Sequence, residues 1–444
     1  ISSYWVSDPG ISFEESFLRH SNIEKTPYFY FSLLKLNFNF FSYDHVSGRY
    51  MSLIFNILGI IFSVLACKIL KNNNSYIFAL FIFATNIFLI NYSQELRVYS
   101  LVFFLSSLYL YLFLKINKFY KDKNFNFLYF FLLSLILSFM LISHPFCFII
   151  FFSTSIFIFL KKFFNKKNSK ILIYNLYFGV FFSLIYLPFL LKGIGSSPSW
   201  ITQPDFKFYT NFYFSKFFGS RLMGLIHLIL ILSLFLYFFK KIIKNDFDLY
   251  ILPIIIFLSY FLPLMYGYLI SPIIFPRYII FVLTPIVVLL SILIYEIKSH
   301  ILRNFLISII VIINFGNNFF EASFQQFYKE RPFFKPNFTQ MIHAISNDET
   351  KLYTIQISAA KDNNKYYYDA INNYISSFQI YKNSKVRYMD KNKFFKSNEK
   401  NIWVICLINI VTDKCKKIKL TPNDKILSEK SIPGIRMVLI SVQS

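Results

Sequence analysis

Long apolar stretches separated by short polar connections run through most of the chain. Each stretch is close to the ~20 residues that an α-helix needs to cross about 30 Å of hydrocarbon. The pattern therefore predicts about ten membrane-spanning helices, because neither strand alternation nor a one-sided helical periodicity dominates. The stretches cover residues 51–70, 76–91, 98–114, 127–143, 145–160, 171–191, 221–239, 249–270, 277–295 and 302–315.

Lysine and arginine are concentrated in alternate connections between these stretches, and this asymmetry predicts the topology. The first, third, fifth, seventh and ninth connections carry them, whereas the others are comparatively poor in both. Because positively charged connections stay in the cytoplasm, we expect the other connections and both chain ends outside. An outside start requires one more helix before residue 1, so we expect about eleven in the full protein. The outer segments are then residues 1–50, 92–97, 142–144, 192–220 and 271–276, and the tail after about residue 316.

Residues 27–50 are aromatic and apolar but are interrupted by charge at Lys35, Asp44 and Arg49. We expect helices here that lie in the outer membrane interface, because a crossing segment would bury these charges in hydrocarbon.

The composition changes after residue 316 to Lys, Asn, Asp and Ser with short apolar stretches. These stretches have the length of strands, and the segment 338–346 is typical of a helix. The predicted fold class is an all-α polytopic membrane bundle with a small C-terminal α/β domain outside the membrane. The expected strands are 352–357, 402–410 and 437–442, and the expected domains are 1–50, 51–316 and 317–444.

Composition supports the membrane assignment. Hydrophobic residues make up 56% of the chain and charged residues 15%, whereas soluble domains carry about 25% charged residues. The net charge of +24 would suggest nucleic acid as the partner of a soluble protein. Here the positive charge indicates which connections lie in the cytoplasm.

Four cysteines are too few for a disulfide framework, and the pairing of Cys406 with Cys415 stays open. The sequence contains no Walker A loop, dinucleotide fingerprint or CxxC pair, so nucleotide-driven chemistry lacks support.

An acidic loop in the first outer segment is one candidate for chemistry. Asp8, Glu14 and Glu15 lie close together in the sequence, just before the aromatic stretch that follows. A carboxylate held near the bilayer can take a proton from an acceptor or bind a metal ion. The alternative is a solvated loop with acidic residues at the start of a helix.

Two further clusters combine Arg with Tyr at outer helix ends. Arg97 and Tyr99 follow Glu95 in one connection, and Arg277 precedes Tyr278 in another. A guanidinium group forms two parallel hydrogen bonds with a phosphate, so the clusters together can hold one lipid phosphate. The alternative is that they are ordinary interface anchors in an aromatic belt. His144 is expected in the same plane, although a single histidine at a helix end is more often structural.

The order of these segments resembles the bacterial polytopic glycosyltransferases of the GT-C fold, relatives of the protein O-mannosyltransferases and the lipid A aminoarabinose transferases. The resemblance covers about residues 1–295 and is carried by the acidic loop and by residues 26–31, 48–52, 92–99, 143–145 and 275–278.

The resemblance implies a polyprenyl-phosphate-linked sugar as donor, a carboxylate of the first outer loop as general base, and basic residues at outer helix ends as the phosphate site. Asp8 matches the base, but Pro9 follows it where the family usually has Glu, so Asp8 and Glu15 both stay open. Arg97, Tyr99, Arg277 and Tyr278 match the phosphate site, and Glu95 and His144 are expected to shape it or meet the acceptor.

The implied enzyme is an inverting hexosyl or pentosyl transferase in the plasma membrane, acting on the outer side. Its partners would be the polyprenyl-linked sugar, membrane lipids and a lipid, glycan or protein acceptor, and no nucleic acid. The sequence names no metal ligand set and leaves open whether a divalent metal assists. The alternatives are an O-antigen ligase or polymerase, and a non-catalytic flippase or transporter of lipid-linked glycans. The flippase reading would predict charge within the spans, where this chain has almost none.

Overall fold

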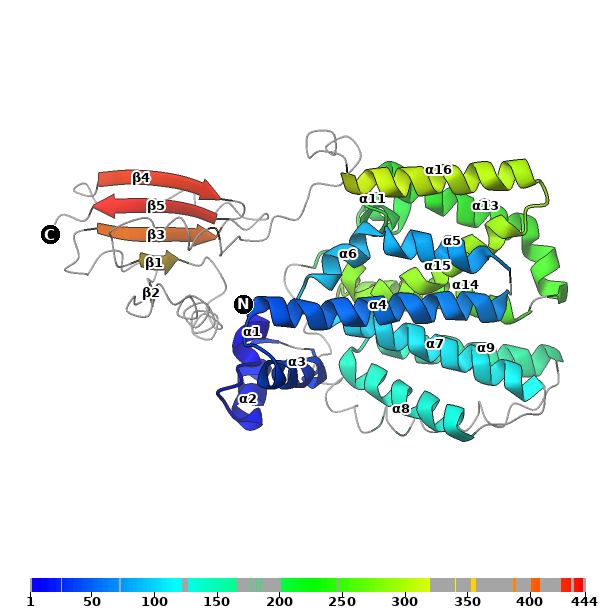
Figure 1. Cartoon of the computed structure of the whole chain (residues 1–444), viewed down its shortest axis with the longest axis horizontal. Coiled ribbons are helices and arrows are strands. Elements are labelled where there is room, and N and C mark those ends of the chain that lie inside the picture. Colours follow the sequence, from blue (N-terminus) through cyan, green and yellow to red (C-terminus); the bar gives the residue numbers. More distant parts are fainter. Residues whose placement is uncertain are drawn as a thin grey trace. The chain divides into compact units, whose positions relative to one another are not determined.

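Figure 1 shows the computed structural model of the chain. The chain divides into two compact units, one formed by residues 1–24 with 332–444 and the other by residues 25–331, and each is described by itself. The structure describes residues 2–24, 26–71, 73–121, 127–165, 177, 181, 184, 201–245, 247–319, 340, 353–356, 386–388, 401–407, 425–432 and 435–441.

The first unit contains two short helices and a sheet. Helix α1, Ser2–Val6, is joined by a turn to α2, Phe13–Ile23, which begins where the Ser12 hydroxyl accepts a hydrogen bond from the backbone N–H of Glu15. Five strands form one mixed sheet in the order β2-β1-β3-β5-β4, in which β1 is parallel to both neighbours and β5 is antiparallel to both of its own. The strands are β1, Tyr353–Gln356; β2, Val386–Tyr388; β3, Asn401–Leu407; β4, Lys425–Ile432; and β5, Ile435–Ser441.

Three of these strands, β1, β3 and β5, overlap the stretches predicted from the sequence. The predicted helix at 338–346 lies outside the described residues except for Gln340, which is helical, and Cys415 also lies outside them. The position of this unit outside the membrane remains a prediction from the lysine pattern.

The second unit is a helical bundle. Its elements are α3, Phe29–Phe40; α4, His45–Leu70; α5, Ser75–Ala84; α6, Ile87–Ser93; α7, Tyr99–Lys121; α8, Phe127–Ser143; α9, Cys147–Asn165; α11, Phe206–Asn211; α12, Phe214–Phe217; α13, Arg221–Asn245; η1, Phe247–Tyr250; α14, Ile251–Leu269; η2, Pro276–Val282; α15, Leu283–Tyr295; and α16, His300–Phe319.

Within the described residues, five helical segments are long and apolar enough to cross a membrane, or six if the bent pair α5 and α6 is one span. The predicted count of about ten is not confirmed, and the predicted stretch 171–191 lies outside the described residues apart from isolated positions. The five are Val46–Leu70, Tyr99–Lys118, Arg221–Phe239, Phe247–Leu269 and Pro276–Tyr295.

The core of the bundle lies around α15, whose residues 283–294 are all buried. Helices α4 and α7 pack side by side along much of their length (Figure 1). Gly59 permits this approach, because a Cβ atom there would overlap the ring of Phe103. The hydroxyl groups of Ser63, Ser107 and Thr284 lie 2.9 Å from one another and join α4, α7 and α15. Such interhelical hydrogen bonds fix the packing where the surroundings are equally apolar on all sides.

Two sequence predictions are corrected by the bundle. The first predicted span begins at His45 rather than at residue 51, because the Asp44 carboxylate caps the helix by accepting a 2.7 Å hydrogen bond from the Ser47 N–H. Arg49 therefore belongs to α4, and α3 is the separate helix in the predicted interfacial stretch 27–50.

The second predicted span, 76–91, is broken into α5 and α6, which are inclined by 55°. Asn86 lies at the break. Its side-chain oxygen caps α6 through the Leu89 N–H at 3.0 Å, and its amide group donates to the Phe217 carbonyl at 3.0 Å. The break directs the end of α6 toward the start of α7 and η2, where the candidate site lies.

Candidate functional site

Arg277 lies at the centre of an aromatic cluster in the second unit. It is the second residue of η2, after Pro276, and its guanidinium carbon lies 4.8 Å from the ring centre of Phe275, 5.5 Å from that of Tyr278 and 5.6 Å from that of Tyr99. Ring faces attract a cation, and more strongly where water is excluded. The cluster therefore holds a permanent positive charge in a half-buried position.

Tyr92, at the end of α6, is a further phenol in this cluster that the sequence reasoning did not select. Its ring centre lies 5.3 Å from that of Tyr99, and its side chain forms a hydrogen bond with Arg277, as does that of Tyr278. Its place in the 92–99 segment was visible in the sequence, but the packing of that segment against η2 was not.

Tyr99 connects the two predicted Arg-Tyr clusters. The ring centres of Tyr99 and Tyr278 are 6.2 Å apart, and both Arg97 and Arg277 act electrostatically on the Tyr99 phenol. Side chains from two separate connections, predicted to act together, are thus gathered around one tyrosine.

Glu95 and Arg97 belong to the connection between α6 and α7. The Glu95 carbonyl accepts hydrogen bonds from the Arg97 N–H at 2.9 Å and from the Ser52 hydroxyl at 2.8 Å, which attaches the connection to α4. Both side chains also act electrostatically on Tyr30, in α3. The backbone of this connection is therefore held by the bundle rather than left as a free loop.

His144 lies between α8 and α9 and is buried against the same cluster. Its ring centre is 5.4 Å from that of Tyr278 and 6.2 Å from that of Tyr99, and its Nδ1 accepts a 3.3 Å hydrogen bond from the Phe146 N–H. Burial, and then the charge of Arg277, lowers the pKa of His144 to about 3. His144 is therefore neutral near pH 7 and adds no charge to the cluster.

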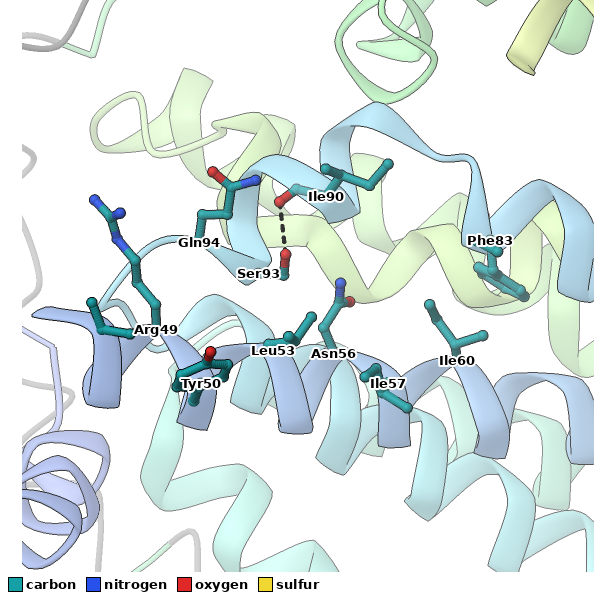
Figure 2. Close-up of a pocket in the computed structure, with 12 residues that line it drawn as sticks. Arg49, Tyr50, Leu53, Asn56, Ile57, Ile60, Phe83, Ile90, Ser93 and Gln94 are labelled. Atoms are coloured by element: carbon teal, nitrogen blue, oxygen red, sulfur yellow. Dashed lines mark hydrogen bonds between the residues drawn. The ribbon is translucent and has the colours of Figure 1, made fainter. Parts of the chain in front are cut away.

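An open groove of about 470 Å³ lies between α4 and the α5–α6 pair. Figure 2 shows Arg49 and Gln94 toward one end of it and Ile60 and Phe83 toward the other. Most of the lining is apolar, including Leu53 and residues of the same face of α4. A groove with a cationic end and an apolar body suits a lipid with an anionic head group. The sequence reasoning did not select any of its residues as a site.

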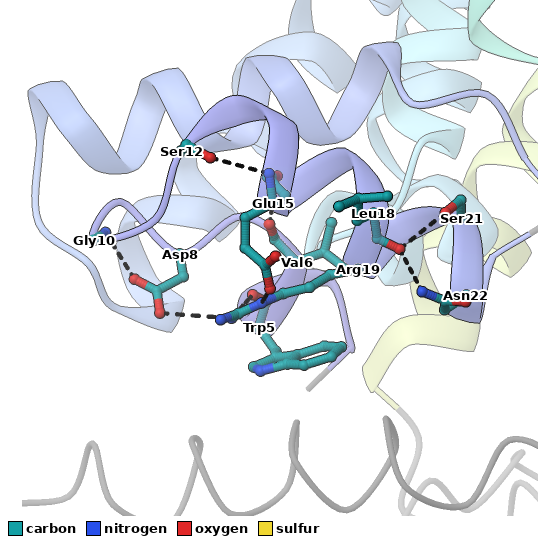
Figure 3. A network of polar contacts seen from close by, with 11 residues as sticks. Trp5, Val6, Asp8, Gly10, Ser12, Glu15, Leu18, Arg19, Ser21 and Asn22 are labelled. Atoms are coloured by element: carbon teal, nitrogen blue, oxygen red, sulfur yellow. Dashed lines mark hydrogen bonds and ion pairs between the residues drawn. The ribbon is translucent and has the colours of Figure 1, made fainter.

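The acidic loop belongs to the first unit and forms a network of its own (Figure 3). Arg19 pairs with Glu15, with a 2.9 Å distance between Nε and Oε1, and lies 3.9 Å from the Asp8 carboxylate. Glu14 is exposed beside Glu15 in the first turn of α2. Within the described part of the chain, no three His, Cys, Asp or Glu side chains come together as a metal site.

No protein-family model matches the chain, and no curated protein matches it in sequence. Solved structures do match. The crystal structure of ArnT from Cupriavidus metallidurans in the apo state has a TM-score of 0.56 at 10% identity, over 94% of this chain and 87% of that one. The same ArnT bound to undecaprenyl phosphate has a TM-score of 0.51 at 10% identity, over 94% and 88%. The Archaeoglobus fulgidus oligosaccharyltransferase in complex with Zn and sulfate has a TM-score of 0.47 at 12% identity, over 86% and 59%.

The two ArnT structures establish the fold. ArnT is a lipid A aminoarabinose transferase of the GT-C fold, so the resemblance predicted from the order of the motifs is confirmed at the level of the fold. An identity of 10% transfers no residue role, and fold by itself does not define function. The roles of the individual residues therefore rest on the chemistry of the site.

Proposed function

We propose that this chain is a membrane glycosyltransferase that moves a sugar from a polyprenyl-phosphate donor to an acceptor on the outer face of the membrane. The observation that carries the proposal is the contact of Arg277 with the rings of Tyr99, Tyr278 and Phe275, in a chain with the fold of ArnT. The ArnT structure solved with undecaprenyl phosphate supports a polyprenyl-linked lipid as the donor class.

The arginine cluster is suited to the leaving group of this reaction. As the bond between the sugar and the phosphate breaks, negative charge grows on the departing phosphate. Arg277 and Arg97 stabilise that charge, and the phenols of Tyr92 and Tyr278 can donate hydrogen bonds to it. The partial burial of the cluster strengthens this effect, because charges there are screened less than in water.

Asp8 supplies the general base in this proposal. Its carboxylate takes the proton from an acceptor hydroxyl or amine, the acceptor atom attacks the anomeric carbon opposite the phosphate, and the bonding electron pair leaves with the phosphate. This displacement inverts the anomeric centre and consumes no nucleotide. Glu15 is the weaker candidate, because its carboxylate forms the close ion pair with Arg19.

The site lies on the outer side of the plasma membrane in this proposal, because the lysine-rich connections are at the opposite helix ends. The groove beside Arg49 offers an apolar surface for the lipid chain of a membrane-embedded substrate.

A sugar-transfer assay tests the proposal. The full chain in lipid nanodiscs is supplied with radiolabelled sugars on undecaprenyl phosphate and with membrane extract as acceptor. We expect label to move to the acceptor in the wild type, and Asp8→Asn to lower turnover by about two to four orders of magnitude, the usual contribution of a general base. Binding of undecaprenyl phosphate should persist in Asp8→Asn, because the arginine cluster is intact.

Two outcomes would contradict the proposal. Movement of the intact lipid-linked glycan across the bilayer with no transfer of sugar would identify a flippase or transporter. An active Asp8→Asn combined with an inactive Glu15→Gln would move the base to Glu15.

A further inference from the structure

Arg19 is held in one orientation by three groups of the first unit. It lies one helical turn after Glu15 on α2, and its Nε donates to the Glu15 carboxylate at 2.9 Å. Its Nη1 donates to the Trp5 carbonyl at 3.2 Å, and its guanidinium carbon lies 4.7 Å above the centre of the Trp5 ring. Figure 3 shows the planar group between the indole and the two carboxylates. A stacked and hydrogen-bonded guanidinium loses most of its rotational freedom.

The platform under Arg19 is itself fixed. Trp5 is buried in α1, and the Ser16 hydroxyl donates a 2.6 Å hydrogen bond to the Val6 carbonyl, which joins α2 to the end of α1. The packing of α1 against α2 therefore fixes the groups that orient the Arg19 guanidinium.

The Asp8 carboxylate has one hydrogen-bond donor and one ion-pair partner. Its Oδ1 accepts a 2.8 Å hydrogen bond from the Gly10 N–H, and its Oδ2 lies 3.9 Å from Nη1 of Arg19. One oxygen thus faces the turn and the other faces the guanidinium. A carboxylate with a different partner at each oxygen has a defined plane, which a general base needs in order to meet its proton at the right angle.

We propose that Arg19 is a positioning residue for Asp8 and that Glu15 acts by holding Arg19. The inference rests on the proposed function, in which Asp8 is the base, and it gives the second carboxylate of the loop a role other than proton transfer. This proposal gives Arg19 no contact with either substrate. Its effect reaches the reaction only through the orientation of Asp8.

The test measures kcat and KM for the polyprenyl-phosphate-linked sugar in the full chain. Arg19→Ala should lower kcat by about ten- to a hundredfold, the usual effect of a misplaced catalytic group, and leave KM for the donor unchanged. Arg19→Lys should recover part of the rate, because it keeps the charge beside Glu15 but loses the fork and the stacking on Trp5. Arg19→Lys also serves as the test variant if Arg19→Ala does not fold.

Matched controls separate positioning from general charge effects. Glu15→Gln should show the same loss of kcat to a smaller degree. Glu14→Gln, which removes the same charge from the neighbouring position, should behave as the wild type because Glu14 is exposed beside the network. Lys425→Gln, which removes a positive charge from an exposed strand of the same unit, should also be without effect.

A double variant distinguishes this inference from the proposed function. In an Asp8→Asn background, Arg19→Ala should cause no further loss, because a residue that acts through Asp8 has nothing left to position. Multiplied losses in the double variant, or a wild-type kcat in Arg19→Ala and Arg19→Lys while Asp8→Asn is inactive, would overturn the role of Arg19 and leave the base assignment standing. A fully active Asp8→Asn would overturn both.

Discussion

The neighbours of Tyr99 make this residue part of the candidate site. Arg277 and Arg97 both act electrostatically on its phenol, and its ring packs near those of Tyr92 and Tyr278. Each of these side chains alone is an ordinary feature of a membrane interface. Together they form the cationic, hydrogen-bonding cluster that we propose as the site of the lipid phosphate.

The two arginines are expected to bind one phosphate jointly. Arg277→Lys and Arg97→Lys each keep the charge but lose the planar pair of donors, so the affinity for undecaprenyl phosphate should fall by about tenfold or more. Arg221→Lys, an exposed arginine at the start of α13, is the matched control and should leave affinity unchanged. Binding is measured by isothermal titration in detergent. Wild-type affinity in both lysine variants would show that these arginines are interface anchors.

His144 is expected to make stability depend on pH on the acid side. Its pKa is about 3 in the folded chain against an ordinary value of 6.5, so between these values the unfolded chain binds a proton that the folded chain does not. The contribution of His144 is complete above about pH 6.5, and the free energy of unfolding falls as the pH is lowered toward 3. Thermal unfolding between pH 4 and 7 should show a smaller fall for His144→Asn than for the wild type. Parallel curves would contradict the buried, neutral state.

At the scale of elements, the break between α5 and α6 brings Tyr92 to the cluster. A straight helix through this stretch would carry the end of α6 in another direction, because the two axes differ by 55°. Asn86 stabilises the break in two ways. Its side chain caps α6, and it donates a hydrogen bond to the carbonyl of Phe217, a residue far away in the sequence. Polar side chains of this kind are how membrane helices satisfy the backbone groups that a break exposes.

Asn86→Ala should therefore cost about 1–2 kcal/mol of stability, the usual value of a lost helix cap with a buried hydrogen bond. Asn74→Ala is the matched control, because Asn74 also precedes a helix but its side chain makes no capping hydrogen bond. The midpoint of thermal unfolding should fall for Asn86→Ala and stay near the wild type for Asn74→Ala. Equal midpoints for the two variants would show that the break is held by packing alone.

At the scale of the whole molecule, the lysine pattern predicts which side of the membrane each connection occupies. With the four native cysteines replaced by serine, a single cysteine at position 397 should react with a membrane-impermeant maleimide in intact cells, and one at position 169 should not. Both positions lie outside the described residues and are predicted from the sequence. The opposite labelling pattern would turn the arginine cluster toward the cytoplasm and contradict an outer-face reaction.

The sequence indicated much of the fold because membrane insertion is decided segment by segment. An apolar run of the right length specifies a helix without reference to the rest of the chain, so five of the predicted runs appear as helices long enough to cross. The limits of these helices were less predictable. The start of α4 depends on the Asp44 cap, and the break at Asn86 depends on a partner carbonyl far along the chain.

The candidate site was likewise predictable from the sequence only in part. The sequence by itself determined that Arg97, Tyr99, Arg277 and Tyr278 lie at helix ends, since charge is excluded from the apolar runs. The sequence also led us to expect His144 near them, and it packs against Tyr278. Only the tertiary structure decided that Tyr92 joins them and that Arg19 lies between Asp8, Glu15 and Trp5. The physical reason is that the cost of burying a charge or an apolar surface can be read from a single segment. Which side chains meet, by contrast, depends on the angles and separations at which whole helices pack.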